Sequence, residues 1–172
     1  RPHQSQDSWV SITFSGTPTI TKSAGAADVT LTMRSHNDVA LTRPITHSGA
    51  ATGRLNVVMN GDIDNSGAGS VSLRSTVSTG GGTLRVDGVS VTTLNTISTA
   101  GTAGRNGGDV QITARPTGFV NMTSGSLVTS GGTATAAGTD AGDVSISGGT
   151  VIARAITASG GVCAPVPTRY DL

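Results

Sequence analysis

The sequence predicts an all-β protein, built as a single-stranded parallel β-helix (a β-solenoid) over residues 19–161. The first observation is a phrase in which Asp-Val, or once Ser-Val, opens an alternating apolar run, at 27–32, 69–73, 108–113 and 142–147. A second phrase runs from an Ile to a Gly four residues later, and it begins at Ile45, Ile63, Ile97 and Ile156. Phrases that recur in this way are typical of coils made of a short strand and a glycine-rich corner.

The composition favours strands over helices. The 172 residues include one Lys, no Glu and 25 Gly, so strong helix formers are scarce, and the abundant Thr, Val and Ile suit a pleated sheet. The formal net charge of +1 and the alternating apolar residues indicate an ordered fold rather than a disordered chain. The four aromatic residues are too few for the thick core of a β-sandwich, so a thin aliphatic core is expected.

The spacing of the phrases predicts coils of about 15 to 20 residues, with copies on every coil or every second coil. Ile45 and Ile63 are 18 residues apart, whereas Asp109 and Asp143 are 34 residues apart. Because strands alternate with a period of two, one set of apolar residues should point inward. This set is Val29, Leu31, Val71, Leu73, Val110, Ile112, Val144 and Ile146.

The phrase at Gly107–Ala114, together with the Ile-to-Gly phrase, resembles the haemagglutinin-type repeats of filamentous-haemagglutinin-like secreted proteins. The resemblance covers residues 19–161. It implies a right-handed parallel β-helix and a place among exported bacterial adhesins and matrix proteins, outside the cell or on its surface. The secretion domain of those proteins is not recognisable here, so the chain is either a fragment or a short relative that assembles differently.

The two ends of the chain differ from its middle. Residues 1–18 form a tail whose strand carries Trp9, Val10, Ile12 and Phe14, and this strand either caps the first coil or adds to a neighbouring subunit. Residues 162–172 are expected to form an extended, proline-punctuated tail. The single Cys163 is either an inert thiol or one half of an intermolecular bridge. The sequence contains no apolar run long enough for a membrane span.

The sequence predicts no enzyme, cofactor, metal site or nucleic-acid partner. No Gly-x-Ser-x-Gly elbow accompanies the three histidines, His3, His36 and His47. The charged residues of the middle coils are expected to be scattered over a solvated surface; they are Arg54, Asp62, Asp64, Arg74, Arg85 and Asp87. Asp140 and Asp143 lack the nine-residue period of calcium-binding rolls. The dispersed arginines and the scarcity of aromatic side chains disfavour nucleic acid.

These observations predict a non-enzymatic extracellular structural protein that assembles head-to-tail into a filament or forms a rod-like surface segment. The last solenoid phrase is apolar and no cap follows it, so the terminal coils present open strand edges. The expected assembly contacts are Trp9, Val10, Ile12, Phe14, Val151, Ile152 and Ile156. The alternative is an adhesin that binds carbohydrate or a surface. An ice-binding protein ranks below it, because Thr-x-Thr triplets occur at irregular offsets.

Overall fold

The computed structural model describes residues 11–14, 19–49, 51–134 and 138–161. These residues form 17 β-strands and no helix, and the paired strands are parallel. The strands lie in three sheets, each of which takes every third strand of the chain. The predicted parallel β-solenoid is therefore confirmed.

The three sheets, named A, B and C here, contain the following strands. Sheet A consists of β1 (Ile12–Phe14), β4 (Val39–Leu41), β7 (Val71–Leu73), β10 (Val91–Thr93), β13 (Phe119–Asn121) and β16 (Thr150–Ile152). Sheet B consists of β2 (Ile20–Lys22), β5 (Ile45–His47), β8 (Val77–Ser78), β11 (Ile97–Ser98), β14 (Ser126–Val128) and β17 (Ala155–Thr157). Sheet C consists of β3 (Val29–Arg34), β6 (Leu55–Asn60), β9 (Leu84–Gly88), β12 (Val110–Ala114) and β15 (Val144–Ser147).

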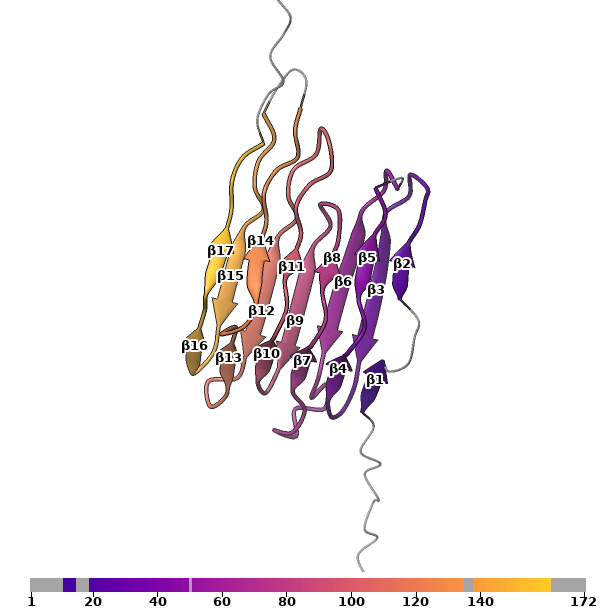
Figure 1. Ribbon diagram of the computed structural model, residues 1–172. Coiled ribbons are helices and arrows are strands. Elements are labelled where there is room, and N and C mark those ends of the chain that lie inside the picture. The colour runs from indigo at the N-terminus through magenta and orange to yellow at the C-terminus, as the bar shows by residue number, and fades with distance from the viewer. Residues whose placement is uncertain (1–10, 15–18, 50, 135–137, 162–172) are drawn as a thin grey trace, which may run out of the picture.

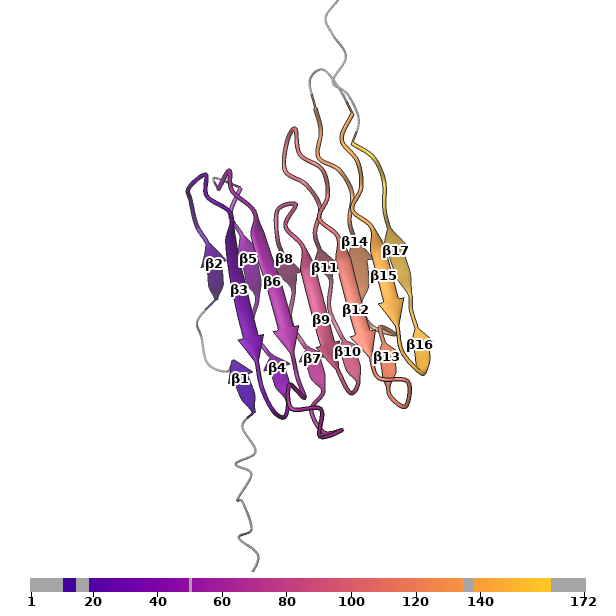
Figure 2. The same cartoon turned by 180° about the vertical axis from the view of Figure 1, so that it is seen from behind.

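Each coil contributes one strand to sheet A, one to sheet B and one to sheet C, in that order. Coil one is β1–β3, coil five is β13–β15, and coil six is represented by β16 and β17. Sheet C forms one layer of a flattened stack, and sheets A and B lie end to end as the opposite layer (Figures 1 and 2). The first and last coils therefore lie at opposite ends of the stack.

Aliphatic side chains from all three sheets fill one narrow core between the layers. Four of the residues predicted to point inward are almost completely buried: Val71, Leu73, Val110 and Ile112. Three others are partly buried and pack against the core: Leu31, Val144 and Ile146. Val29 also lies in the inward phase, in register with buried Leu55, but it is 42% exposed. The reason is that β3 is the end strand of sheet C, so within the described residues no further strand covers Val29 on its outer side.

The predicted coil length is also wrong. Equivalent positions of sheet A are 32 residues apart from Val39 to Val71 and 20 residues apart from Val71 to Val91. Asp109 and Asp143, 34 residues apart, lie on neighbouring coils rather than two coils apart. The strands are similar in every coil, and the connections between them account for the variation in length.

Two of the repeated phrases do not have the positions that the sequence indicated. Residues 69–73 contain β7, which belongs to sheet A rather than to sheet C with the Asp-Val phrases. The phrase that begins at Ile63 lies in the connection between β6 and β7 and contains no strand. The sheet C strands of coils two and three are β6 and β9, and neither begins with Asp-Val. Apolar residues alternate with a period of two in the strands of all three sheets. This period could therefore not show to which sheet a strand belongs.

The aspartate that opens the Asp-Val phrase joins one coil to the next. Asp28 Oδ1 accepts a hydrogen bond from the Arg54 amide (2.6 Å), and Asp109 Oδ1 accepts one from the Asp143 amide (2.9 Å). In both cases the donor is the backbone of the following coil, so the phrase stabilises the stacking of coils.

The second phrase places a buried polar side chain beside sheet B, where the two layers approach each other. Thr99, which is fully buried, donates a hydrogen bond from Oγ1 to the Gly108 carbonyl of the opposite layer (2.6 Å). His47 occupies the equivalent place in coil two and donates from Nε2 to the Gly53 carbonyl (2.8 Å). These side chains hold the layers together, and His47 is therefore a structural residue.

Candidate functional site

At the C-terminal end of the described stack, apolar side chains are exposed. Val151 and Ile156 belong to the inward-facing columns of sheets A and B, since they lie in register with Val120 and Leu127. Val120 and Leu127 have no exposed surface, whereas Val151 is 42% and Ile156 43% exposed. In sheets A and B, the inward residues of every earlier coil are covered by the coil that follows. Within the described residues, no coil follows β16 and β17.

The main chain gives the two ends of the stack opposite hydrogen-bonding edges. An inward residue donates to the following coil, as Val110 does to the Asp143 carbonyl (2.8 Å). An outward residue donates to the preceding coil, as Arg74 does to the Leu41 carbonyl (2.8 Å). The far edge of β16 therefore presents the amide and carbonyl of Val151, and the first coil presents the outward groups of β1 and β2. The two edges are complementary for parallel addition.

The N-terminal strand lies on its own chain. β1 is the end strand of sheet A, and it pairs with β4 through Ile12–Val39 and Phe14–Leu41. Ile12 is half-buried there. Trp9 and Val10 lie outside the described residues. Of the seven predicted assembly contacts, Val151, Ile152 and Ile156 are exposed together at the C-terminal end, and Ile12 lies at the opposite end of the stack. Their role in assembly stays a prediction.

A second feature is a polar groove of about 410 Å³ where β6, β9 and β12 of sheet C end. Its polar lining includes Asn60, Asp62, Arg85, Asp87, Thr113 and Arg115. Arg85 Nε donates a hydrogen bond to Asp87 Oδ2 across a distance of 2.7 Å. The sequence reading treated Asp62, Arg85 and Asp87 as scattered charges, and this is wrong, because the register of the coils brings them to one groove. Arg54 and Arg74 do not line it.

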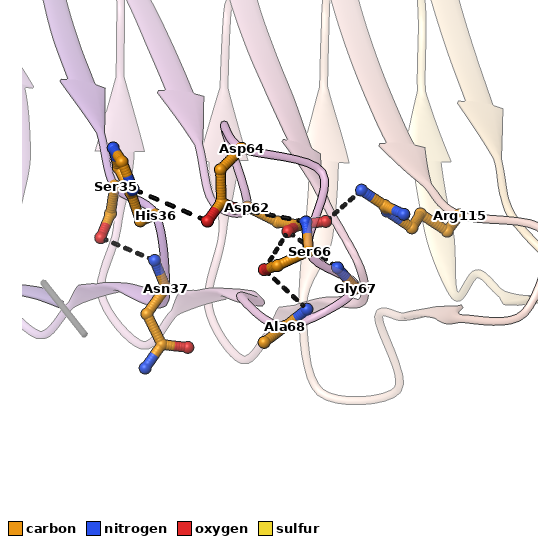
Figure 3. A network of polar contacts seen from close by, with 9 residues as sticks. All are labelled: Ser35, His36, Asn37, Asp62, Asp64, Ser66, Gly67, Ala68 and Arg115. Atoms are coloured by element: carbon orange, nitrogen blue, oxygen red, sulfur yellow. Dashed lines mark hydrogen bonds and ion pairs between the residues drawn. The ribbon is translucent and has the colours of Figure 1, made fainter. Parts of the chain in front are cut away.

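The wall of the groove is the connection at residues 61–70, which Asp62 organises (Figure 3). Asp62 Oδ1 accepts hydrogen bonds from Ser66 Oγ (3.0 Å) and from the Gly67 amide (3.1 Å). Asp62 Oδ2 forms an ion pair with Arg115 Nη2, and Arg115 also donates to Asn65 Oδ1 (3.1 Å). The Asp62 side chain is 2% exposed. Arg115 follows β12, so a residue two coils away neutralises this buried carboxylate.

Local backbone chemistry explains why this connection turns as it does. Asp62 has a φ of 63° and Asn65 a φ of 59°, a left-handed conformation that Asp and Asn tolerate better than most side chains do. Gly69 has a φ of 109°, and a Cβ there would lie 2.6 Å from the Asn37 carbonyl oxygen of the preceding coil. The Asn60-Gly61 pair is a turn signal in the sequence, and the first residue of this connection with a positive φ is the next one, Asp62.

Two ionisable groups near the groove have shifted pKa values. Desolvation acts to raise the pKa of Asp64, but hydrogen bonds from Ser66 and the positive charge of His36 outweigh it, so the pKa lies below its ordinary value. His36 Nδ1 lies 3.6 Å from Asp64 Oδ2 (Figure 3). The hydrogen bond to Asp87, together with the charge of its carboxylate, raises the pKa of Arg85. The two shifts favour the charged carboxylate of Asp64 and the charged guanidinium of Arg85.

Neither a metal cluster nor a membrane helix is found in the described part of the chain. No group of three or more His, Cys, Asp or Glu side chains there is placed to hold a metal ion. No helix in these ranges has the length and apolar character needed to cross a membrane. His36 is exposed and His47 is buried beside sheet B, whereas His3 and Cys163 lie outside the described residues.

No protein-family profile, curated protein or solved structure matches this chain. The resemblance of its repeats to haemagglutinin-type repeats therefore stays an interpretation of the sequence.

Replacement of Arg115 by alanine is expected to lower the free energy of unfolding by about 1–3 kcal/mol. Loss of one partner from a buried ion pair typically costs about 3–5 kcal/mol, and the effect is smaller here because the Arg115 side chain is 33% exposed. Urea denaturation measures the loss, and amide hydrogen exchange at Gly67 shows whether the connection opens locally. Arg74→Ala is the matched control, because the exposed Arg74 side chain bonds only the Ser72 hydroxyl among the described residues. Equal losses in the two variants would contradict this assignment.

Proposed function

We propose that this protein is a non-enzymatic structural protein, a rod-like β-solenoid that is extended by head-to-tail stacking of identical subunits. The observation that carries the proposal is the exposure of Val151 and Ile156 in columns that are otherwise buried. Burial of an aliphatic side chain stabilises by roughly 1.5–3 kcal/mol. An open strand edge also provides unpaired amides and carbonyls for a further strand.

The register of the sheets supports one particular contact between subunits. In sheet A, Ile12 and Val151 belong to the same column, so β1 of the next subunit would place Ile12 beside Val151. In sheet B, β2 of the next subunit would place Ile20 beside Ile156 in the same way. The contact is heterologous, because one end of the stack binds the opposite end of the next. Repetition of such a contact gives an open fibre.

We place this function outside the cell, on a bacterial-type surface or in an extracellular matrix. Support for this setting comes from the resemblance of the repeats to those of secreted haemagglutinins. A fractionation experiment tests it: the native protein should be found in the culture medium or on the cell surface, and recovery in the cytosol would contradict the assignment.

Sedimentation velocity and negative-stain microscopy of the purified chain test the assembly. The wild-type protein is expected to form concentration-dependent oligomers and unbranched rods. Ile156→Asp should abolish these species and leave the β circular dichroism unchanged, because a charge at this exposed end prevents stacking without entering the core. Gln111→Asp is the matched control, since it places the same charge on the exposed outer face of a middle coil.

A wild-type chain that stays monomeric at every concentration would overturn the proposal, as would rods that persist in Ile156→Asp. Deletion of residues 1–15 separates the two roles of the N-terminal strand. Loss of the rods with retained β circular dichroism supports an exchange strand, because β1 then acts at the junction. Unfolding of a monomer that never forms rods supports a cap and contradicts assembly.

A second candidate function is binding of carbohydrate, as in an adhesin. The polar groove at the end of β6, β9 and β12 favours it, because side chains with unused hydrogen-bonding capacity converge there from three coils. This candidate is compatible with the first one, since the groove lies in the middle of the stack and stacking at the ends leaves it open.

A further inference from the structure

The floor of the groove is a row of three polar side chains on adjacent strands. Asn60, Asp87 and Thr113 occupy the same register position of β6, β9 and β12. Neighbouring strands lie about 4.8 Å apart, so the row presents an amide, a carboxylate and a hydroxyl at regular intervals. All three residues line the groove. Their side chains point outward, because they alternate with the buried residues Met59, Val86 and Ile112.

These side chains have hydrogen-bonding capacity that the described part of the chain does not use. Arg85 binds Asp87 Oδ2 through Nε, which leaves both Nη nitrogens of Arg85 and Oδ1 of Asp87 without a partner among the described residues. The side-chain amide of Asn60 and the hydroxyl of Thr113 also lack a hydrogen-bond partner within these residues. The Arg85 side chain is 56% exposed and that of Asp87 20% exposed, so a ligand can reach both.

The wall of the groove is built before any ligand arrives. The Asp62–Arg115 ion pair and the hydrogen bonds of Asp62 to Ser66 and Gly67 hold residues 61–70 against the end of sheet C. The same connection bonds to the preceding coil through the Ile63 amide and the Ser35 carbonyl (3.1 Å). Because these walls are already ordered, less of the binding free energy is lost to ordering them when a ligand binds.

The charges of the groove identify the class of ligand. Two arginines and two aspartates line it, and each arginine is paired with one aspartate, so the lining has no net charge. A neutral lining disfavours strongly charged ligands, and the polar floor disfavours apolar ones. The floor offers both kinds of group, since Asn60 and Thr113 can each donate and accept and the Asp87 carboxylate accepts, and a sugar hydroxyl can also act as both. We propose that this groove binds a neutral saccharide, with Asn60, Asp87, Arg85 and Thr113 as its hydrogen-bonding contacts.

This assignment rests on the second candidate function, carbohydrate binding, and names the site for it. Among the described residues that line the groove, none is aromatic, so these contacts would hold the ligand by hydrogen bonds rather than by stacking. Single-site affinity should accordingly be low. A rod that repeats the groove once per subunit raises the apparent affinity for a polymeric glycan through multivalency.

Amide NMR titration of the full chain with short neutral oligosaccharides of glucose, mannose, galactose and N-acetylglucosamine tests the proposal. We expect at least one of them to shift amides of residues 60–67, 85–88 and 113–116. Asp87→Ala and Arg85→Ala should each weaken that binding about tenfold or more, because each removes a charged hydrogen-bonding partner. Gln111→Ala is the matched control, since Gln111 lies beside Arg85 on the outer face of sheet C but does not line the groove.

The outcomes separate the site from the function. If a neutral oligosaccharide shifts amides elsewhere and the two variants bind it normally, the groove assignment is overturned while carbohydrate binding stands. If none of the oligosaccharides changes the spectrum at millimolar concentration, both are overturned. Binding of an anionic oligogalacturonate in place of every neutral sugar would overturn the ligand class.

Discussion

Val110→Asp is expected to lower the free energy of unfolding by about 3–5 kcal/mol, the largest effect anticipated for a single substitution in this chain. Val110 is 1% exposed and lies between Leu84 and Val144 of the adjoining coils. A carboxylate at this position would be buried in the aliphatic core with no charged partner nearby. Urea denaturation followed by circular dichroism measures the change.

Gln111→Asp is the control for this experiment. Gln111 is the next residue of the same strand, but it faces solvent, so the added charge stays hydrated. Its effect should lie within about 0.5 kcal/mol of zero. If both variants lost the same stability, the inward column would be assigned to the wrong phase. Because coils contact only their neighbours, Val110→Asp should also speed amide exchange most strongly in β9, β12 and β15.

Gly108→Ala is expected to cost about 3 kcal/mol, at the upper end of the range for overpacking. A Cβ on Gly108 would lie 2.0 Å from the carbonyl oxygen and 2.4 Å from the carbonyl carbon of Gly82 in the preceding coil. These are backbone atoms, so the added methyl group can be accommodated only if the coils separate. The same separation would weaken the hydrogen bond from Thr99 to the Gly108 carbonyl.

The matched control for Gly108→Ala is Gly49→Ala. No heavy atom beyond the chain neighbours lies within 4 Å of a Cβ at Gly49, and its φ is not in the left-handed region. Alanine there should be neutral or stabilising by a few tenths of a kcal/mol, because it restricts the unfolded chain. Thermal unfolding of both variants measures the difference. A Gly108→Ala protein as stable as Gly49→Ala would show that the coils are not packed this closely.

Two features could be predicted from sequence, because each depends on neighbouring residues only. They are the inward-facing residues of β12 and the strands of sheet B at Ile45, Ile97 and Ile156. The terminal hydrophobic residues could be predicted for the same reason, and Val151 and Ile156 are exposed where a further coil would stack. The length of the coils could not be predicted. Connections such as residues 61–70 vary in length without disturbing the strands, and no local sequence pattern predicts that length.

The polar groove could not be predicted from the sequence, for a related reason. Asn60, Asp87 and Thr113 share a row only because their strands stack in one particular register. Asp62 and Arg115 are 53 positions apart in the chain, and the ion pair between them exists because coil three has no long connection between β9 and β10. Neither residue stands in a recognisable motif, and the charges consequently looked scattered.

The sequence by itself determined the kind of fold: parallel β coils with a thin aliphatic core, glycine at the close approaches and an Asp at the start of several strands. These properties follow from the alternation of side chains within a strand and from intrinsic preferences of the residues, both of which act over a few positions. The tertiary structure decided which strand pairs with which, how long each coil is and where the groove lies. Register relates segments that are far apart in the sequence, and it depends on how whole coils pack against one another. The sequence of a single segment therefore does not determine its register.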